Sequence, residues 1–260
     1  MSNCCVIVTI KNRLDHFLQT FPFMVSQYGI PYELVLVNFH SNDDFEEKLK
    51  FECEFRKDTF SPYLQKIKQV KLLEDLKFNP RKARNLGAAY CNDKEAILLF
   101  SDADVFLGMT YTSFWCDKVK RGKTFAVTRR QESWAAIPCR VEPEINYGNF
   151  VVHGQDYYKV NGFDERYGYY GGDDDDIYHR LKLLGLKEIN PYDRIDSRQY
   201  SILHDDELRL AQMEEAIRID SNEELKRIYN NTNYFVKDNQ FINLDYAKDI
   251  AIEEIVYEKK

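Results

Sequence analysis

The sequence predicts an α/β protein with an open, mostly parallel twisted sheet and helices on both faces, in a single domain. Three short apolar runs support this fold: CCVIVTI (4–10), ELVLVNF (33–39) and AILLF (96–100). Runs of this length without polar alternation are typical of strands covered on both faces. Patterns typical of helices lie between them, and an alternation of strands and helices is the signature of a parallel sheet.

The helical patterns occupy residues 13–29, 43–56 and 81–92. In the third, Ala83, Leu86, Gly87 and Tyr90 recur at helical spacing, and this face of mostly small residues predicts close packing against a neighbour. Further strands are expected at 124–130 and 149–154, followed by a loop rich in glycine and aromatic residues at 157–172. A helix is then expected from about residue 174 to Gly185, and a last one where SNEELKRIY opens with a capping box.

The composition limits the possible functions. The formal net charge of −7 and the isoelectric point near 5.4 argue against a general nucleic-acid binder, which needs a basic face. The six cysteines form no C-x-x-C pair, so we expect buried thiols in a reducing compartment. Neither a signal peptide nor an apolar run long enough to span a membrane is evident, which predicts a cytoplasmic protein.

Asp102 and Asp104 follow the third apolar run in LLFSDADVFLG. Two residues apart on a strand, they are expected on the same side, at the carboxyl edge where open α/β sheets bind ligands. Carboxylate oxygens there could hold Mn²⁺ or Mg²⁺ together with a diphosphate. The alternative is a polar turn that only caps the strand.

Four aspartates follow two glycines in RYGYYGGDDDDIYHRL (166–181). Asp174 shares a helix face with Ile177 and Leu181, which directs its carboxylate inward and suits a general base. Gly171 and Gly172 would permit a ligand to approach the backbone closely. The alternative is an N-terminal cap followed by a solvated acidic turn.

Together these segments resemble the GT-A fold glycosyltransferases, in particular the β-1,4-galactosyltransferases and the chondroitin-type bacterial polymerases. The segment GFDERYGYYGGDDDDIYHRL is similar to that group's glycine-rich acidic run, and FSDADV to its D-x-D strand. FNPRKARNLG and TIKNRLDHF are similar to its nucleotide-contacting segments. The resemblance covers residues 4 to 205, in order.

The resemblance implies a role for each matched residue. Asp174 is expected to be the catalytic base, and Asp173 to hydrogen-bond the acceptor sugar. Metal ligands are expected at Asp104, Asp102 and His204. The expected contacts to the nucleotide sugar come from Thr9, Arg13, Phe78, Arg81, Asp102, Tyr170 and Gly172, with Tyr170 standing where the group has a tryptophan.

The expected activity is that of an inverting, metal-dependent glycosyltransferase in polysaccharide biosynthesis. It would use Mn²⁺ (or Mg²⁺) and move a sugar from a UDP-sugar to a glycan or lipid-linked glycan. Residues 1–130 would bind the nucleotide sugar, residues 131–215 the acceptor, and residues 216–260 would form a helical or extended tail. The alternatives are a retaining GT-A transferase and a nucleotide- or cation-binding module without turnover.

Overall fold

The computed structural model describes residues 4–73, 78–134, 137–138, 144–165, 173–190, 199–202 and 252–258. The described strands are β1 (Cys4–Ile10), β2 (Tyr32–Asn38), β3 (Leu64–Leu72), β4 (Ile97–Asp102), β5 (Val105–Leu107), β6 (Thr124–Trp134), β7 (Ile137–Pro138), β8 (Glu144–His153), β9 (Lys187–Ile189), β10 (Gln199–Ile202) and β11 (Ile252–Glu258). The described helices are α1 (Leu14–Met24), α2 (Phe45–Arg56), α3 (Pro80–Ala89), α4 (Tyr111–Lys118), α5 (Gly154–Lys159) and α6 (Asp173–Leu183), with a short 3-10 helix at Lys57–Thr59.

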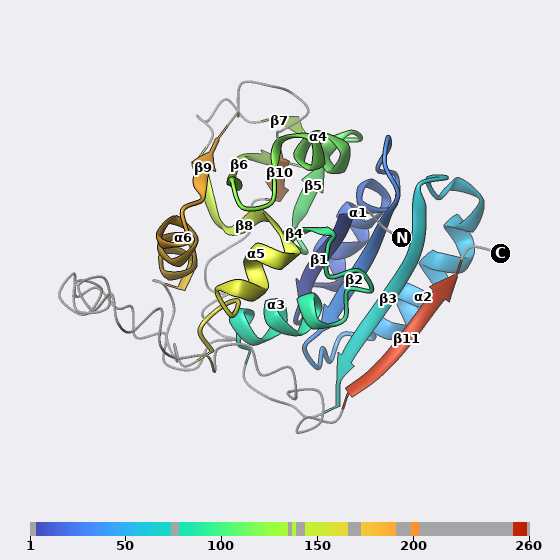
Figure 1. The fold of residues 1–260 in the computed structure, drawn as a ribbon. Coiled ribbons are helices and arrows are strands. Elements are labelled where there is room, and N and C mark those ends of the chain that lie inside the picture. Colours follow the sequence, from blue (N-terminus) through green and yellow to red (C-terminus); the bar gives the residue numbers. More distant parts are fainter. Residues whose placement is uncertain are drawn as a thin grey trace.

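These strands form one sheet in the order β11-β3-β2-β1-β4-β8-β6-β10-β5, with β7 and β9 paired to β6 (Figure 1). Strands β3, β2, β1 and β4 are parallel, and β8 and β6 continue the sheet antiparallel. From β1 the chain passes to β2 and β3 on one side, then crosses to place β4 on the other. Ligands of open α/β sheets bind at such a reversal, so the carboxyl ends of β1 and β4 are the expected site.

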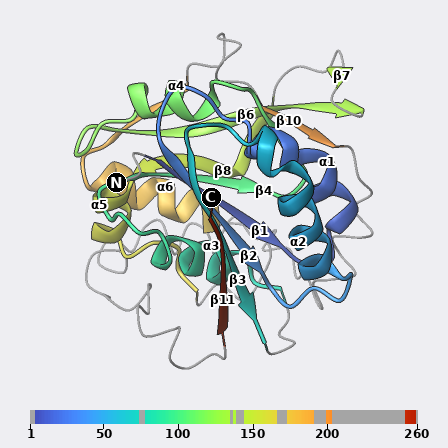
Figure 2. The ribbon, with the colours of Figure 1, turned by 90° about the vertical axis from the view of Figure 1, so that its right-hand side faces the viewer.

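Helices cover both faces of the sheet (Figure 2), which confirms the predicted fold class. On one face Cys4, Val6 and Val8 share a buried cluster with side chains of α1, α2 and α4. On the other face Cys5 and Ile7 share a cluster with side chains of α3, α5 and α6. Because side chains alternate along a strand, the continuous apolar run of β1 supplies both layers.

Helix α3 packs against the sheet through a glycine. A Cβ atom at Gly87 would lie 2.3 Å from Cγ2 of Ile7 and 3.1 Å from Cγ2 of Val37. Real Cβ atoms do not approach so closely, so the helix could not keep this position with a larger residue. The predicted close packing of the small-residue face is confirmed, and it brings the residues of α3 near the carboxyl ends of β1 and β4.

Helix α4 and the strands β5, β7, β9 and β10 were not predicted from the sequence, and three other elements also differ from the expectations. Strand β3 was not predicted because its sequence LQKIKQVKL mixes lysine and glutamine with apolar residues, although β11 pairs with it and Lys68 and Gln69 are buried. Helix α1 ends at Met24, before the end of the predicted pattern. Helix α5 occupies the start of the predicted aromatic loop. The helix expected at SNEELKRIY lies outside the described residues.

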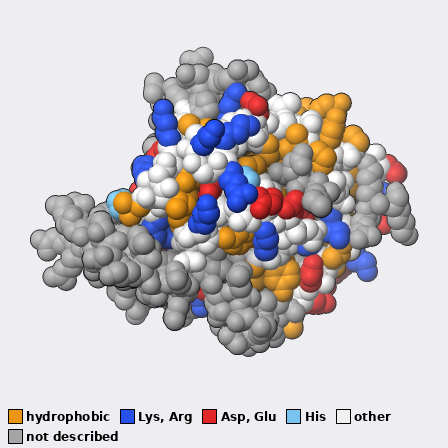
Figure 3. Space-filling model, viewed as in Figure 1, with side chains coloured by type: hydrophobic (Ala, Val, Ile, Leu, Met, Phe, Trp, Pro, Cys, Tyr) orange, Lys and Arg blue, Asp and Glu red, His pale blue; other side chains and the backbone are white. Residues whose placement is uncertain are grey.

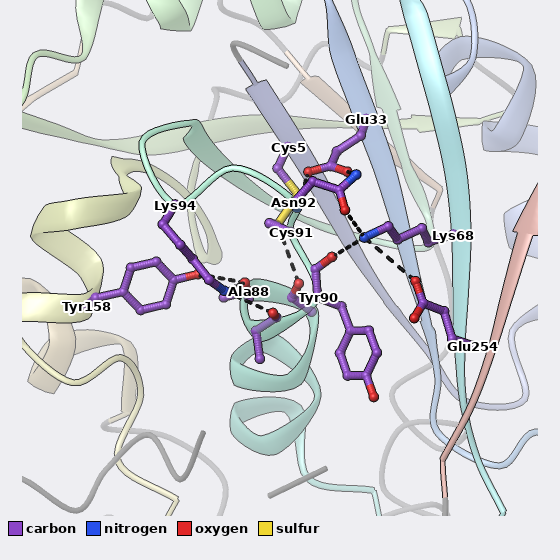
Figure 4. Close-up of a disulfide and its surroundings, with 12 residues drawn as sticks. Cys5, Glu33, Lys68, Ala88, Tyr90, Cys91, Asn92, Lys94, Tyr158 and Glu254 are labelled. Atoms are coloured by element: carbon purple, nitrogen blue, oxygen red, sulfur yellow. Dashed lines mark hydrogen bonds and ion pairs between the residues drawn. A yellow bond between two sulfur atoms is a disulfide. The ribbon is translucent and has the colours of Figure 1, made fainter. Parts of the chain in front are cut away.

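The expectation of unpaired thiols is wrong for two cysteines. Cys5 of β1 and Cys91, two residues beyond α3, form a disulfide across a sequence separation of 86 residues (Figure 4). Sequence spacing gave no sign of this pair, because the parallel topology alone brings the end of α3 beside the start of β1. Cys4 and Cys53 are buried thiols, as expected.

Within the described residues, no helix has the length and apolar character needed to cross a membrane. On the face seen in Figure 3, lysine and arginine side chains lie beside aspartate and glutamate side chains over the described surface. This face therefore carries both signs of charge.

Candidate functional site

The carboxyl ends of β1 and β4 bring two of the expected site residues together. Thr9 of β1 pairs in register with Asp102, the last residue of β4. Thr9 is buried, whereas the Asp102 side chain is one-third exposed, at 33%. Asp102 therefore presents its carboxylate at the sheet edge, where the topology predicts a ligand site.

Asp104 does not share a strand with Asp102, so the expectation of two same-side strand residues is wrong. Strand β4 ends at Asp102, and Ala103 and Asp104 form a turn before β5. Thr20 of α1 donates a hydrogen bond of 2.6 Å to the Ala103 carbonyl. This contact holds the turn, and the Asp104 carbonyl accepts from the Ile202 N–H of β10 at 2.9 Å.

A residue that the sequence reasoning did not single out occupies the centre of the site. The Arg84 guanidinium on α3 lies between two carboxylates, with Nη2 at 3.5 Å from Oδ1 of Asp102 and Nη1 at 3.4 Å from Oδ1 of Asp174. Its Cζ lies 5.2 Å from the centre of the Phe163 ring. Asn149 of β8 donates to Oδ2 of Asp102 at 3.3 Å.

Asn85, the next residue of α3, fixes the segment that leads from α5 toward the acidic run. Its Nδ2 donates to the Phe163 carbonyl at 2.9 Å and to Glu165 at 2.7 Å. Its Oδ1 accepts from the Tyr157 hydroxyl at 2.6 Å and from the Phe163 N–H at 2.9 Å. Burial raises the pKa of the Glu165 carboxyl above its ordinary value, and the bond from Asn85 partly opposes this shift.

Helix α6 begins at Asp173, and its second residue is Asp174. The Asp174 side chain is 19% exposed, while Ile177 and Leu181 on the predicted inward face are fully buried. The expected inward direction of Asp174 is therefore consistent with its contact to Arg84. Asp176, which the sequence did not distinguish from its neighbours, is more deeply buried and pairs with Arg180 at 2.5 Å.

The residues expected to contact the nucleotide lie around the same sheet edge. Arg13 stands at the start of α1, directly after the loop that follows β1. Phe78 packs edge-to-face on Phe39, after β2, with ring centres 5.5 Å apart. Arg81 lies in the first turn of α3 and is buried, and the Asn79 side chain accepts from its backbone N–H at 3.1 Å.

Tyr170, Gly172 and His204 lie outside the described residues. His204 is the second residue after β10, and the bond between Ile202 and Asp104 brings this end of β10 to the aspartate turn. A carboxylate at a strand end and another in the turn that follows offer the hard oxygen ligands that Mn²⁺ and Mg²⁺ prefer. Asp102 and Asp104 therefore fit a divalent cation by chemistry.

In the described part of the chain, another group of three side chains lies close enough together to be considered as metal ligands. Sulfur atoms of Cys5 and Cys91 and a carboxylate oxygen of Glu33 lie within 4.8 Å of one another. Both sulfurs are joined in the disulfide, and Asn92 donates two hydrogen bonds to Glu33. This cluster lies at the amino end of β1, away from Asp102.

Arg84, Asn85 and Asn149 are the site residues that sequence reasoning missed. Arg84 and Asn85 belong to the quoted segment FNPRKARNLG, in which Arg84 follows Arg81 by one helical turn. Two arginines at that spacing beside a small-residue face could have indicated a basic helix edge near a ligand. Asn149 carried no comparable signal, because only strand pairing places it beside β4.

The comparisons with known proteins bear on the family resemblance and on the fold. Residues 139–205 match the family model described as the N-terminal domain of galactosyltransferase. Human β-1,4-galactosyltransferase 3 is 28% identical over 116 residues, which is 44% of this chain and 28% of that protein, so the chain spans less than a third of this relative. The rat protein of the same name has the same identity, 28% over 116 residues.

Solved structures share the fold over most of the chain. A Pyrobaculum calidifontis mannosyltransferase in complex with GDP-Man and Mn²⁺ has a TM-score of 0.58 at 14% identity, covering 77% of this chain and 56% of that one. Drosophila β1,4-galactosyltransferase 7 in complex with manganese, UDP-Gal and xylobiose has a TM-score of 0.55 at 13% identity, covering 87% and 80%. The chain has the GT-A glycosyltransferase fold and resembles the β-1,4-galactosyltransferases.

Proposed function

We propose that this protein is an inverting, metal-dependent glycosyltransferase that moves a sugar from a UDP-sugar to a hydroxyl group of a glycan acceptor. The observation that carries the proposal is the meeting of Asp102 and Asp174 on Arg84 at the carboxyl edge of the sheet. The solved relatives named above that hold a nucleotide sugar hold it together with manganese.

Asp174 is proposed as the general base. Its partly exposed carboxylate would accept the proton of the acceptor hydroxyl as that oxygen attacks the anomeric carbon from the face opposite the diphosphate. A single displacement of this kind inverts the anomeric configuration. Asp173, at the first position of α6, is proposed to hydrogen-bond the acceptor sugar.

Asp102 and Asp104, with His204, are proposed to hold the cation. When bound, a divalent cation would neutralise negative charge that develops on the leaving diphosphate. Thr9, Arg13, Phe78 and Arg81 would orient the nucleotide, since they follow or lie beside the strands that end at this edge. Tyr170 and Gly172 are proposed to contact the sugar, as the sequence resemblance implies.

The first test is calorimetric binding of UDP, GDP and CDP, each with Mn²⁺ and with EDTA. We expect UDP to bind with Mn²⁺ and to lose that binding in EDTA, because the diphosphate is held through the cation. Absence of metal-dependent binding of any nucleotide would contradict the proposed donor site.

The second test is Asp174→Asn, which keeps the size of the side chain and removes its basicity. Transfer is expected to fall by about 10²-fold or more, while UDP binding stays near that of the wild type. Wild-type turnover in this variant would exclude Asp174 as the base.

Two further observations test the alternative functions. The anomeric configuration of the product of the wild-type enzyme, examined by NMR, distinguishes inversion from retention. Nucleotide binding without transfer to any acceptor would indicate a module without turnover.

A further inference from the structure

Arg84 faces one carboxylate from each half of the proposed site. Asp102 ends a strand of the nucleotide-binding half, and Asp174 begins a helix 72 positions later in the acceptor half. The two nitrogens of one guanidinium face them, at 3.5 Å and 3.4 Å from their nearest oxygens. One guanidinium therefore stands between the two carboxylates.

The surroundings of Arg84 restrict its motion. Its side chain is only 8% exposed and stacks on Phe163. Asn85 hydrogen-bonds both the N–H and the carbonyl of Phe163, so the ring that supports the guanidinium is fixed to the same helix. One turn further along α3, Gly87 sits against Ile7 and sets the distance of the helix from the sheet.

The chemistry of arginine suits this position. A guanidinium is planar and offers separate N–H groups in a rigid fork, so it can face two carboxylates at once. A lysine ammonium is a single point charge on a flexible chain and cannot hold two groups at a defined separation. Both distances exceed those of a tight charge-assisted hydrogen bond, so the arginine faces both carboxylates without a short bond to either.

A second buried arginine, Arg180, offers a comparison with Arg84. Arg180 pairs with Asp176 on its own helix and donates to the carbonyls of Val160 and Gly162. None of these partners belongs to the proposed site. Arg84, in contrast, faces two aspartates to which the proposed function assigns roles.

We propose that Arg84 is a positioning residue that holds the base Asp174 at a fixed distance from the metal ligand Asp102. This inference rests on the proposed function. Arg84 acts through the two aspartates: it aligns the acceptor hydroxyl held by Asp174 with the donor held at Asp102. Alignment of reacting groups lowers the barrier of the chemical step, and small displacements cost large factors in rate.

The test compares Arg84→Lys and Arg84→Met with the wild type, and uses Arg121→Met as the matched control. Arg121 is an exposed arginine in the turn before β6, paired with Glu95. For each protein we would measure kcat and KM for donor and acceptor, UDP affinity with Mn²⁺, and the melting temperature. We expect kcat to fall about a hundredfold in Arg84→Met and about tenfold in Arg84→Lys.

The expected losses in kcat are accompanied by KM values, UDP affinity and melting temperatures close to those of the wild type and of Arg121→Met. Unchanged kcat in Arg84→Lys would overturn the inference, since charge alone would then suffice. Losses that follow the melting temperature or the UDP affinity would also overturn it, in favour of a structural or donor-binding role. A wild-type protein that transfers no sugar would instead refute the proposed function, and the inference with it.

Discussion

Single side chains in this protein differ in role according to what surrounds them, even within one acidic run. Of the four adjacent aspartates, Asp175 is exposed, Asp174 reaches Arg84, and Asp176 is buried with 1% exposure. Among these three aspartates, a solvated acidic turn, the alternative interpretation of the run, describes Asp175. Asp176 is held by Arg180, because an unpaired carboxylate in the core would carry a large desolvation cost.

The pair of Asp176 and Arg180 gives a prediction at this scale. Replacing Arg180 with Met leaves a buried carboxylate without its charge partner and removes donors to two carbonyl groups. We expect the free energy of unfolding to fall by about 3 kcal/mol. Urea denaturation followed by circular dichroism measures the change.

The control for this prediction is Lys118→Met, which breaks an exposed pair with Asp117. Its stability is expected to stay close to that of the wild type, because solvent screens exposed pairs. Equal losses in the two variants would contradict the argument, since burial would then have no influence on the energy of the pair.

Among the elements, α3 connects most of the observations. Its first turn carries Arg81, its middle carries Arg84 and Asn85, and Cys91 follows its end. The helix runs from the carboxyl edge of the sheet to the amino edge, so its packing determines where the site residues lie. Asn79 caps its start by accepting from the N–H groups of Arg81 and Lys82, and Pro80 occupies the first turn, where proline is tolerated.

Gly87→Ala tests the packing of this helix. The added methyl group would meet Cγ2 of Ile7 at 2.3 Å, so the helix or the strand must move. We expect a loss of about 2 kcal/mol in the free energy of unfolding. Ile7→Ala removes the opposing methyl group, so the double variant is expected to lose less than the sum of the two single changes. Strict additivity would contradict the close contact.

At the scale of the whole molecule, the disulfide joins distant parts of the chain. Cys5 lies in the first strand, and Cys91 lies after the third helix. Around it Asn92 donates to the buried Glu33, and Lys68 donates to Asn92 and to the Tyr90 carbonyl (Figure 4). The disulfide from β1 therefore lies beside a polar network that connects β2, β3 and the chain beyond α3.

Cys91→Ala is expected to lower the free energy of unfolding by about 4 kcal/mol, because the cross-link closes a long loop in the unfolded chain. The measurement is chemical denaturation with and without dithiothreitol. Reductant should destabilise the wild type and leave the variant unchanged. A wild type insensitive to complete reduction would contradict the contribution of the disulfide.

Local sequence was sufficient to predict the frame of the protein. The apolar runs of β1, β2 and β4 identified strands covered on two faces, because only buried strands lack polar alternation. The spacing around Gly87 indicated close packing of α3, and Asp102 could be placed at a strand end from the run before it. These predictions succeeded because each depends on residues within one element.

The remaining features depend on contacts between distant segments. Strand β3 lies inside the sheet because both β2 and β11 pair with it, and Cys5 meets Cys91 because α3 returns the chain to the start of β1. The turn at Ala103 separates Asp104 from the strand that carries Asp102. Arg84 contacts Asp102 and Asp174 only after α3, β4 and α6 have packed, and long-range packing of this kind leaves no periodic signal in the sequence.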